Sequence, residues 1–232
     1  MRIIEVGSYH KYLGRHIPGE FTHRTMTEID YLIQVGWYKF GQHKHVLCNR
    51  NIGIHLRLKL FDAVVTPTIL YGLVALPLSS TSLQKIEVVQ RKMLRKIVGW
   101  VRLQGESWEA TMHRMKDRVE DALKKHPVML WRRRIGIHLW KYVLRIKAAP
   151  SESWISQSCT WAPNESDDPY SEYFPYRCRG RPCLKWDASV CRYCNLHLNA
   201  SWQELSIDVL KNSMDDFVHY FCASEHDVEM LE

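Results

Sequence analysis

The sequence predicts a mainly α-helical protein with a short N-terminal β-hairpin and a small C-terminal segment. Apolar residues recur at helical spacing in several long stretches, and proline and glycine residues separate these stretches. Alternation typical of strands occurs only near the N-terminus. With 232 residues, 46% of them hydrophobic, the chain can bury one good core and has room for a small second domain.

The N-terminal residues favour a hairpin with Ile3, Ile4 and Val6 in its first strand and a turn near Gly7-Ser8. Tyr9–Ile17 is then the second strand. Helix signals follow, beginning with Thr27 as an N-cap and Asp30 three residues later. We expect helices from Thr27 to Phe40 and over His55–Val65, Thr68–Leu76, Ser82–Val101, Ser107–Lys125 and Val128–Lys147, and a last one from Ser201, where Glu204 completes a capping box.

These signals divide the chain into four parts. Residues 1–20 form the hairpin, 21–147 a helical domain, 148–176 an irregular linker rich in proline and acidic residues, and 177–232 a small C-terminal helical segment. We find no internal repeat.

Charge is distributed unevenly along the chain. Residues 1–150 hold 26 Lys/Arg and 11 Asp/Glu, a net of +15, whereas residues 151–232 hold 6 and 14, a net of −8. A basic half joined to an acidic half indicates that the first half meets a polyanion. The alternative is that basic helices simply face water and the acidic tail keeps the chain soluble.

The cysteines and apolar runs indicate an intracellular protein without a membrane span. No signal peptide is visible, so the seven cysteines are expected to be reduced thiols. Ala63–Gln84 carries no charge, but Pro67, Pro77 and a Ser/Thr cluster interrupt it, which favours a buried core helix over a span.

The strongest candidate for a binding surface is the helix expected over Ser82–Val101. Its apolar residues fall on one side, and six cations fall on the other: Lys85, Arg91, Lys92, Arg95, Lys96 and Arg102. Such a face can neutralise several phosphates, while Trp100 or Tyr71 can pack against a sugar or base. A solvated surface helix is the alternative, but Glu87 is almost the only acid near the charged face.

Five segments of the chain, in their order, resemble the C-terminal part of non-LTR (LINE-type) retrotransposon reverse transcriptases. They are Tyr12-Leu13-Gly14, Glu28-Ile29 with Gly36-Trp37, Leu60–Gly72, Gln90–Trp100, and Gly180-Arg181-Pro182 before Trp186-Asp187. The resemblance spans nearly the whole chain. It implies a primer-grip-like turn at Tyr12, Leu13 and Gly14, and a helical thumb-like bundle over 21–147 that holds a template–primer duplex. RNA or an RNA–DNA hybrid is the partner it implies, together with the polymerase portion that precedes this region in the family.

Catalytic acids are missing from the expected place. In that family, aspartates of a Tyr/Phe-x-Asp-Asp turn upstream of Tyr-Leu-Gly hold two Mg²⁺ ions, and the chain has no room for that palm before Tyr12. Asp167-Asp168 and Asp215-Asp216 lack the strand–turn–strand context, and we expect both pairs to be solvated. No catalytic residue, metal ligand or cofactor is therefore assigned, and the chain is not expected to be an enzyme as it stands.

The remaining motifs are weak. Cys191 and Cys194 could supply thiolates to zinc, with His197, Cys178 or Cys183 completing the site, but ordinary semi-buried thiols are the favoured interpretation. Arg132–Arg134 could be a nuclear-localisation patch, although a basic helix face is the simpler reading. The rival functions are therefore a non-catalytic protein-interaction module, stabilised by zinc or not, and a decayed reading frame without a selected function.

Overall fold

The computed structural model describes residues 9–12, 15–18, 24–160 and 186–223, and these are mainly α-helical, as the sequence predicts. The chain divides into two compact units, residues 1–135 with 224–232 and residues 136–223. The division falls within helix α6 (Trp131–Ala148). The limits expected for four sequence domains remain a prediction.

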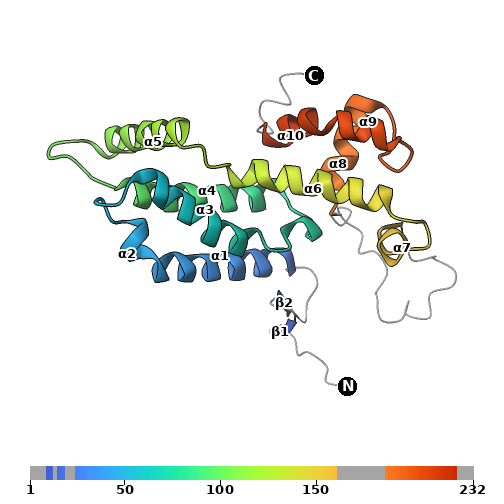
Figure 1. Cartoon of the computed structure of the whole chain (residues 1–232), viewed down its shortest axis with the longest axis horizontal. Coiled ribbons are helices and arrows are strands. Elements are labelled where there is room, and N and C mark those ends of the chain that lie inside the picture. Colours follow the sequence, from blue (N-terminus) through green and yellow to red (C-terminus); the bar gives the residue numbers. More distant parts are fainter. Residues whose placement is uncertain (1–8, 13–14, 19–23, 161–185, 224–232) are drawn as a thin grey trace. The chain divides into compact units, whose positions relative to one another are not determined.

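The first unit is a helical bundle. Helices α1 (Arg24–Gln42), α3 (Ile54–Leu70) and α4 (Ser80–Val98) pack against one another, and α5 (Trp108–Lys125) packs on α4, as Figure 1 shows. The short α2 (Lys44–Leu47) and a 3₁₀ turn, η1 (Leu73–Ala75), complete the unit. Phe61, Met93 and Ile97 are fully buried in its core.

A glycine sets the approach of α1 to α3. A Cβ added at Gly36 would lie 2.3 Å from Cγ1 of Ile69, closer than any van der Waals contact allows. Gly41, one turn and a half further along α1, has no such neighbour within 4 Å. The glycine at position 36 therefore permits the close packing of the two helices.

The N-terminal hairpin with a turn near Gly7-Ser8 is not supported. Its first strand and its turn lie outside the described residues. What the structure pairs instead is β1 (Tyr9–Tyr12) with β2 (Arg15–Pro18), antiparallel, with Tyr12 opposite Arg15. The stretch Tyr9–Ile17, which we expected to be one strand, thus contains parts of two strands that pair with each other.

Proline does not end the second helix of the bundle, contrary to the expectation. α3 runs without a break through Pro67, which lies in its last turn. A proline there removes only one hydrogen bond near the end of the helix, and the hydroxyl of Thr68 donates to the carbonyl of Val64 at 2.9 Å. The helix ends at Leu70, Tyr71 is its C-cap, and Gly72 then adopts a left-handed conformation with φ 65°.

One described segment, Ile54–Ala75, is long and apolar enough to cross a bilayer by composition alone. A buried core helix passes the same test. Arg57 and Phe61 on this segment are almost fully buried within the first unit, which fits a core helix.

The start of α6 is attached to α3 and α4 by buried polar contacts. The side chain of Gln90 accepts a hydrogen bond from the backbone N of Trp131 at 2.8 Å and donates one to the carbonyl of Met129 at 3.4 Å. The indole of Trp131 donates to Thr66 at 2.9 Å. Gln90 is 1% exposed, so it satisfies a free N–H at the beginning of a helix where water has no access.

An aromatic core organises the second unit. Trp140 in the second half of α6 contacts α8 (Ala188–Tyr193), α9 (Ile207–Asn212) and α10 (Met214–Cys222), and a π-helical turn η2 (Cys194–Leu198) packs against α8. Trp140 stacks on Phe217 with ring centroids 4.5 Å apart and donates its indole N–H to the carbonyl of Leu210 at 2.7 Å. Helix α7 (Trp154–Thr160) lies in the stretch expected to be an irregular linker, most of which is outside the described residues.

Two expected N-caps are wrong. α1 already begins at Arg24, so Thr27 lies inside the helix. The N–H of Ser201 does donate to the carboxylate of Glu204 at 3.4 Å, but the next helix begins only after Ser206, whose hydroxyl accepts a hydrogen bond from the N–H of Val209. The capping pattern at Ser201 and Glu204 therefore forms a turn, and two residues separate this turn from α9.

Candidate nucleic-acid interface

Helix α4 carries the predicted basic face. Ser79 caps its N-terminus by accepting a hydrogen bond from the N–H of Ser82 at 3.2 Å. One side of the helix is buried against its neighbours, by the residues Leu83, Ile86, Val89, Met93, Leu94 and Ile97. Val98, which strays from the expected pattern, is buried too, whereas Val88 is exposed on the basic side.

The cations on the outer side differ in their partners. Lys85 forms a salt bridge with Asp30 of α1, and Arg91 forms one with Glu87 at 3.6 Å. Lys92 and Lys96 are exposed, and neither makes an ion pair or hydrogen bond with the part of the chain that the structure describes. These two lysines are therefore the cations most available to an anionic partner.

Arg95 and Arg102 have structural contacts. The guanidinium of Arg95 is half-buried and lies 3.8 Å from the sulfur of Met112 on α5. Arg102 does not lie on the helix, contrary to the expectation, because α4 ends at Val98 and Gly99 follows with φ 97°. This backbone conformation favours glycine and turns the chain away from the helix axis.

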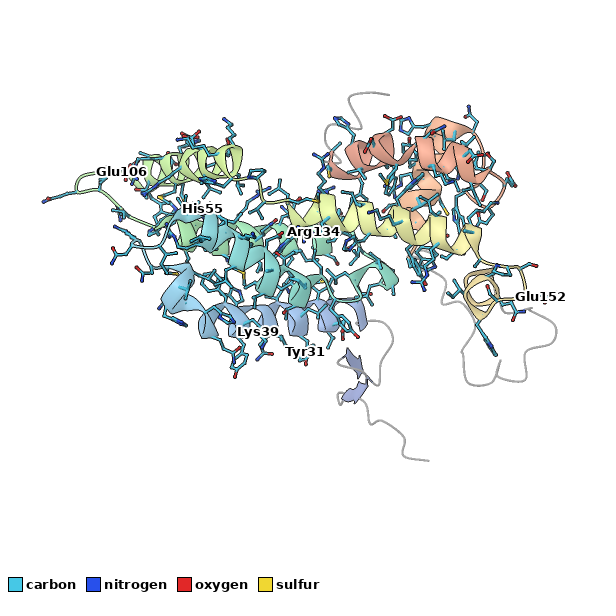
Figure 2. All side chains as sticks on the ribbon, viewed as in Figure 1. Tyr31, Lys39, His55, Glu106, Arg134 and Glu152 are labelled. Carbon is cyan, nitrogen blue, oxygen red and sulfur yellow. The ribbon has the colours of Figure 1, made fainter. Side chains whose placement is uncertain are left out.

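The loop from Gly99 to Ser107 is held by the carboxylate of Glu106, labelled in Figure 2. Arg114 of α5 donates to both its oxygens at 2.8 Å, the hydroxyl of Thr111 donates at 2.7 Å, and the N–H of Leu103 donates at 3.2 Å. These hydrogen bonds, that of Arg114 foremost, lower the pKa of Glu106 to about 2. The guanidinium of Arg102 donates to the backbone carbonyl of Glu106, so both ends of the loop are fixed.

Two tryptophans stand at the ends of this loop. Trp100 is 36% exposed and Trp108 is 59% exposed, and their ring centroids are 5.7 Å apart at an angle of 50°. Leu103, between them in the loop, is 53% exposed. An ordered loop therefore presents a compact apolar surface to solvent.

An arginine cluster at the C-terminal end of α4 was not predicted from the sequence. Arg57 of α3 is 6% exposed and donates one guanidinium N–H to the carbonyl of Ile97. Its Nε has no hydrogen-bond partner among the described residues. A Cβ added at Gly99 would lie 3.4 Å from the guanidinium of Arg50, which places that side chain at the same end of the helix.

The electrostatics of Arg57 reflect its surroundings. Burial lowers the pKa of Arg57, and the positive charges of Arg118 and Arg50 lower it further, while Cys48 acts in the opposite direction. The sequence did hold a signal for this residue. Position 57 falls on the apolar stripe of its helix together with Phe61 and Val65, and a charge on such a stripe is unusual.

The structure brings only part of the predicted site together. Of the primer-grip-like residues, Tyr12 lies in β1, and Leu13 and Gly14 lie outside the described residues. Tyr71, a candidate for packing on a sugar or base, is 53% exposed at the end of α3.

The arginine run on α6 serves helix packing in part. Arg134 pairs with Asp62 at 2.8 Å and Arg132 approaches Glu87 at 3.8 Å. This arrangement suits a basic helix face that helps to hold the bundle together.

The cysteine pair has a structural environment. Cys194 is fully buried, and Cys191 donates to Asp187 at 3.4 Å, which also accepts from the indole of Trp202 at 3.1 Å. Burial, together with Asp187, raises the pKa of Cys191 to about 12, and burial raises that of Cys194 to about 11. Within the described ranges no group of three or more His, Cys, Asp or Glu residues could hold a metal ion. The zinc partners Cys178 and Cys183 lie outside these ranges.

Only one of the two acidic pairs lies in the part of the chain that the structure describes. Asp215 and Asp216 are exposed in the first turn of α10, where acids suit the positive end of a helix dipole. Asp167 and Asp168 lie outside the described residues.

No known protein family matches the chain, and neither a curated protein nor a solved structure matches it significantly.

Proposed function

We propose that this chain is related to the primer-grip and thumb part of a non-LTR retrotransposon reverse transcriptase and binds nucleic acid through the outer face of α4. The observation that carries this proposal is the pair of exposed lysines, Lys92 and Lys96, that have no acidic partner in the described part of the chain. The order of the five sequence segments supports the family relationship.

The dimensions of the basic face suit a phosphate backbone. A helix rises about 1.5 Å per residue, so Lys85 and Lys96 are separated by about 17 Å along α4. A nucleic-acid strand in a duplex carries a phosphate every 3.4 Å or so along its axis. One face can thus contact several phosphates, which gives affinity without sequence preference.

The buried side of α4 supports the same assignment. Its contacts with α1, α3 and α5 hold the helix in place, so its backbone does not need to be ordered on binding. A rigid element with a charged outer face is suited to holding a duplex of regular geometry, such as an RNA–DNA hybrid.

Neutralisation of the basic face tests the proposal. We expect the fourfold variant Arg91→Gln/Lys92→Gln/Arg95→Gln/Lys96→Gln to lose most of its affinity for an RNA–DNA hybrid, as measured by fluorescence anisotropy, and binding by the parent chain to weaken steeply with salt. Circular dichroism would establish that the variant is folded. Unchanged affinity in the folded variant would exclude this face.

This proposal assigns no polymerase activity to the 232 residues alone. In a primer-extension assay with Mg²⁺ and nucleotides, we expect the purified chain to leave the primer unextended. Template-directed synthesis would refute the non-catalytic part of the proposal and leave the binding part intact.

A further inference from the structure

The loop between α4 and α5 combines exposed aromatic rings with nearby unpaired arginines. We propose that it binds one unpaired nucleotide next to the duplex, with the base on Trp108 and the adjoining phosphate near the exposed Arg50. This inference rests on the proposed function of α4 and specifies which form of nucleic acid the protein prefers: a duplex that carries an unpaired extension.

The loop is ordered before any partner arrives. The carboxylate of Glu106 accepts hydrogen bonds from Arg114, Thr111 and the backbone of Leu103, and Arg114 also donates to the carbonyl of Val101 at 2.6 Å. Ser107 caps α5 by accepting from the N–H of Ala110 at 3.1 Å. A preorganised loop loses little conformational entropy on binding.

The geometry of the two rings decides how a base can bind. Trp100 and Trp108 are in mutual contact at 5.7 Å, so a base does not fit between them. Trp108 is the more exposed of the two, at 59%. A base therefore stacks on the exposed part of Trp108, whose ring Trp100 contacts at an angle of 50°. Aromatic platforms of this kind bind unpaired bases of any sequence.

Positive charge adjoins the aromatic surface. The guanidinium of Arg50 lies against Gly99, the residue before Trp100, and Arg57 donates to the carbonyl of Ile97. Neither arginine, nor Arg118 beside them, forms a salt bridge with a carboxylate among the described residues. Arg57 is only 6% exposed, so its charge acts from beneath the surface, and the exposed Arg50 makes the direct contact with phosphate.

The combination selects a nucleotide over an acidic peptide. Carboxylates on a peptide would use the arginines and leave Trp108 in water, whereas a nucleotide uses both through one linked phosphate and base. The aromatic surface directly follows α4 in the chain, because Trp100 lies in the loop after Val98 and Trp108 begins α5, which permits a strand to pass from the cations of α4 to the rings.

Binding to two forms of one hybrid tests this inference. We expect the full chain to bind a hybrid with a short unpaired extension more tightly than the same hybrid with blunt ends. Trp108→Ala should reduce affinity for the extended form about tenfold, on the scale of a single base–aromatic stack, and leave the blunt form unaffected. Trp154→Ala is the matched control, because Trp154 is 85% exposed on α7 of the other unit.

Photocrosslinking gives a second readout that does not depend on affinity. With 5-iodouracil in the unpaired extension, we expect mass spectrometry to find the crosslink on Trp108 or Trp100. Arg50→Gln should weaken binding of the extended form only. Crosslinks elsewhere, or equal loss in Trp108→Ala and Trp154→Ala, would overturn the inference.

The two proposals fail in different ways. If the fourfold α4 variant loses affinity for both hybrids while Trp108→Ala changes neither, the duplex face stands and the nucleotide site is wrong. If Trp108→Ala acts on the extended form while the α4 variant binds normally, the nucleotide site stands and the duplex face is wrong. Tighter binding of an acidic peptide than of either hybrid would overturn the nucleotide site.

Discussion

The two unpaired lysines of α4 allow a quantitative prediction about salt. Lys92→Gln/Lys96→Gln removes two charges that are exposed and have no described partner. The double variant keeps the buried side of the helix unchanged, so the fold should be preserved. If both lysines contact phosphates, their removal should change the salt dependence of binding as well as the affinity.

The magnitude follows from counterion release. Each phosphate contact contributes about 0.9 to the slope of log K against log salt, so loss of two contacts should make the slope shallower by about 1.8. At about 0.15 M salt, one such contact corresponds to about fivefold in affinity, and the pair to about 30-fold. Arg91 and Lys85, which already face carboxylates, should contribute less per residue than the two lysines.

Fluorescence anisotropy with a labelled hybrid, at salt concentrations from about 0.05 to 0.3 M, measures both quantities. Lys116→Gln/Lys124→Gln is the matched control, because it removes the same charge from α5, where each lysine lies within 4.0 Å of an acid on its own helix. Equal changes of slope in the two double variants would show that net charge, and not the face of α4, governs binding. That result would refute the reasoning.

Three further predictions concern stability. Gly36→Ala should lower the free energy of unfolding by about 1–3 kcal/mol, because the added methyl group would overlap Ile69 of α3. Gly41→Ala, where nothing lies within 4 Å, should be neutral or slightly stabilising. Urea unfolding of the two variants measures the difference. Gln90→Ala should cost about 2 kcal/mol in the same assay, since it leaves a buried N–H unsatisfied, and Gln84→Ala on the exposed side should stay within about 0.5 kcal/mol. The pKa of Glu106 is lowered to about 2, so its stabilisation of the loop is fully present above the ordinary carboxyl pKa of 4.5 and is lost as the pH falls from there through 2. The NMR shift of the loop amide that donates to this carboxylate should follow the titration, and a midpoint near 4.5 would contradict it.

The fold class and the buried side of α4 could be predicted from the sequence because they depend on periodicity. The 3.6-residue repeat identified the residues that pack, including Met93 and Ile97. The C-terminal end of the same helix was predicted less accurately. Gly99 ends it at Val98, so Arg102 was placed on a face that it does not share.

The site depends on long-range contacts that periodicity does not contain. Arg57 and Ile97 are 40 residues apart in the sequence and meet only because α3 packs on α4. Likewise, Arg114 of α5 donates a hydrogen bond to Glu106 in the preceding loop, and the residues of this loop have no repeating pattern that would predict the contact. A local capping motif was also misleading where the tertiary structure placed the helix start elsewhere, as at Thr27.

Folding stability alone does not explain the loop between α4 and α5. The contacts that order it are polar and are made by Glu106, Arg114 and Thr111, none of which requires an aromatic neighbour. Trp108 is the first residue of α5, a position where many side chains serve equally well. Its ring nevertheless leaves 59% of its surface in water, where apolar area is unfavourable. A stable arrangement that keeps such a ring exposed beside unpaired arginines is better explained by a partner that covers both. Replacement of Trp108 by a polar helix former such as Glu should therefore leave the thermal midpoint of unfolding unchanged or raised, while binding of the extended hybrid is lost.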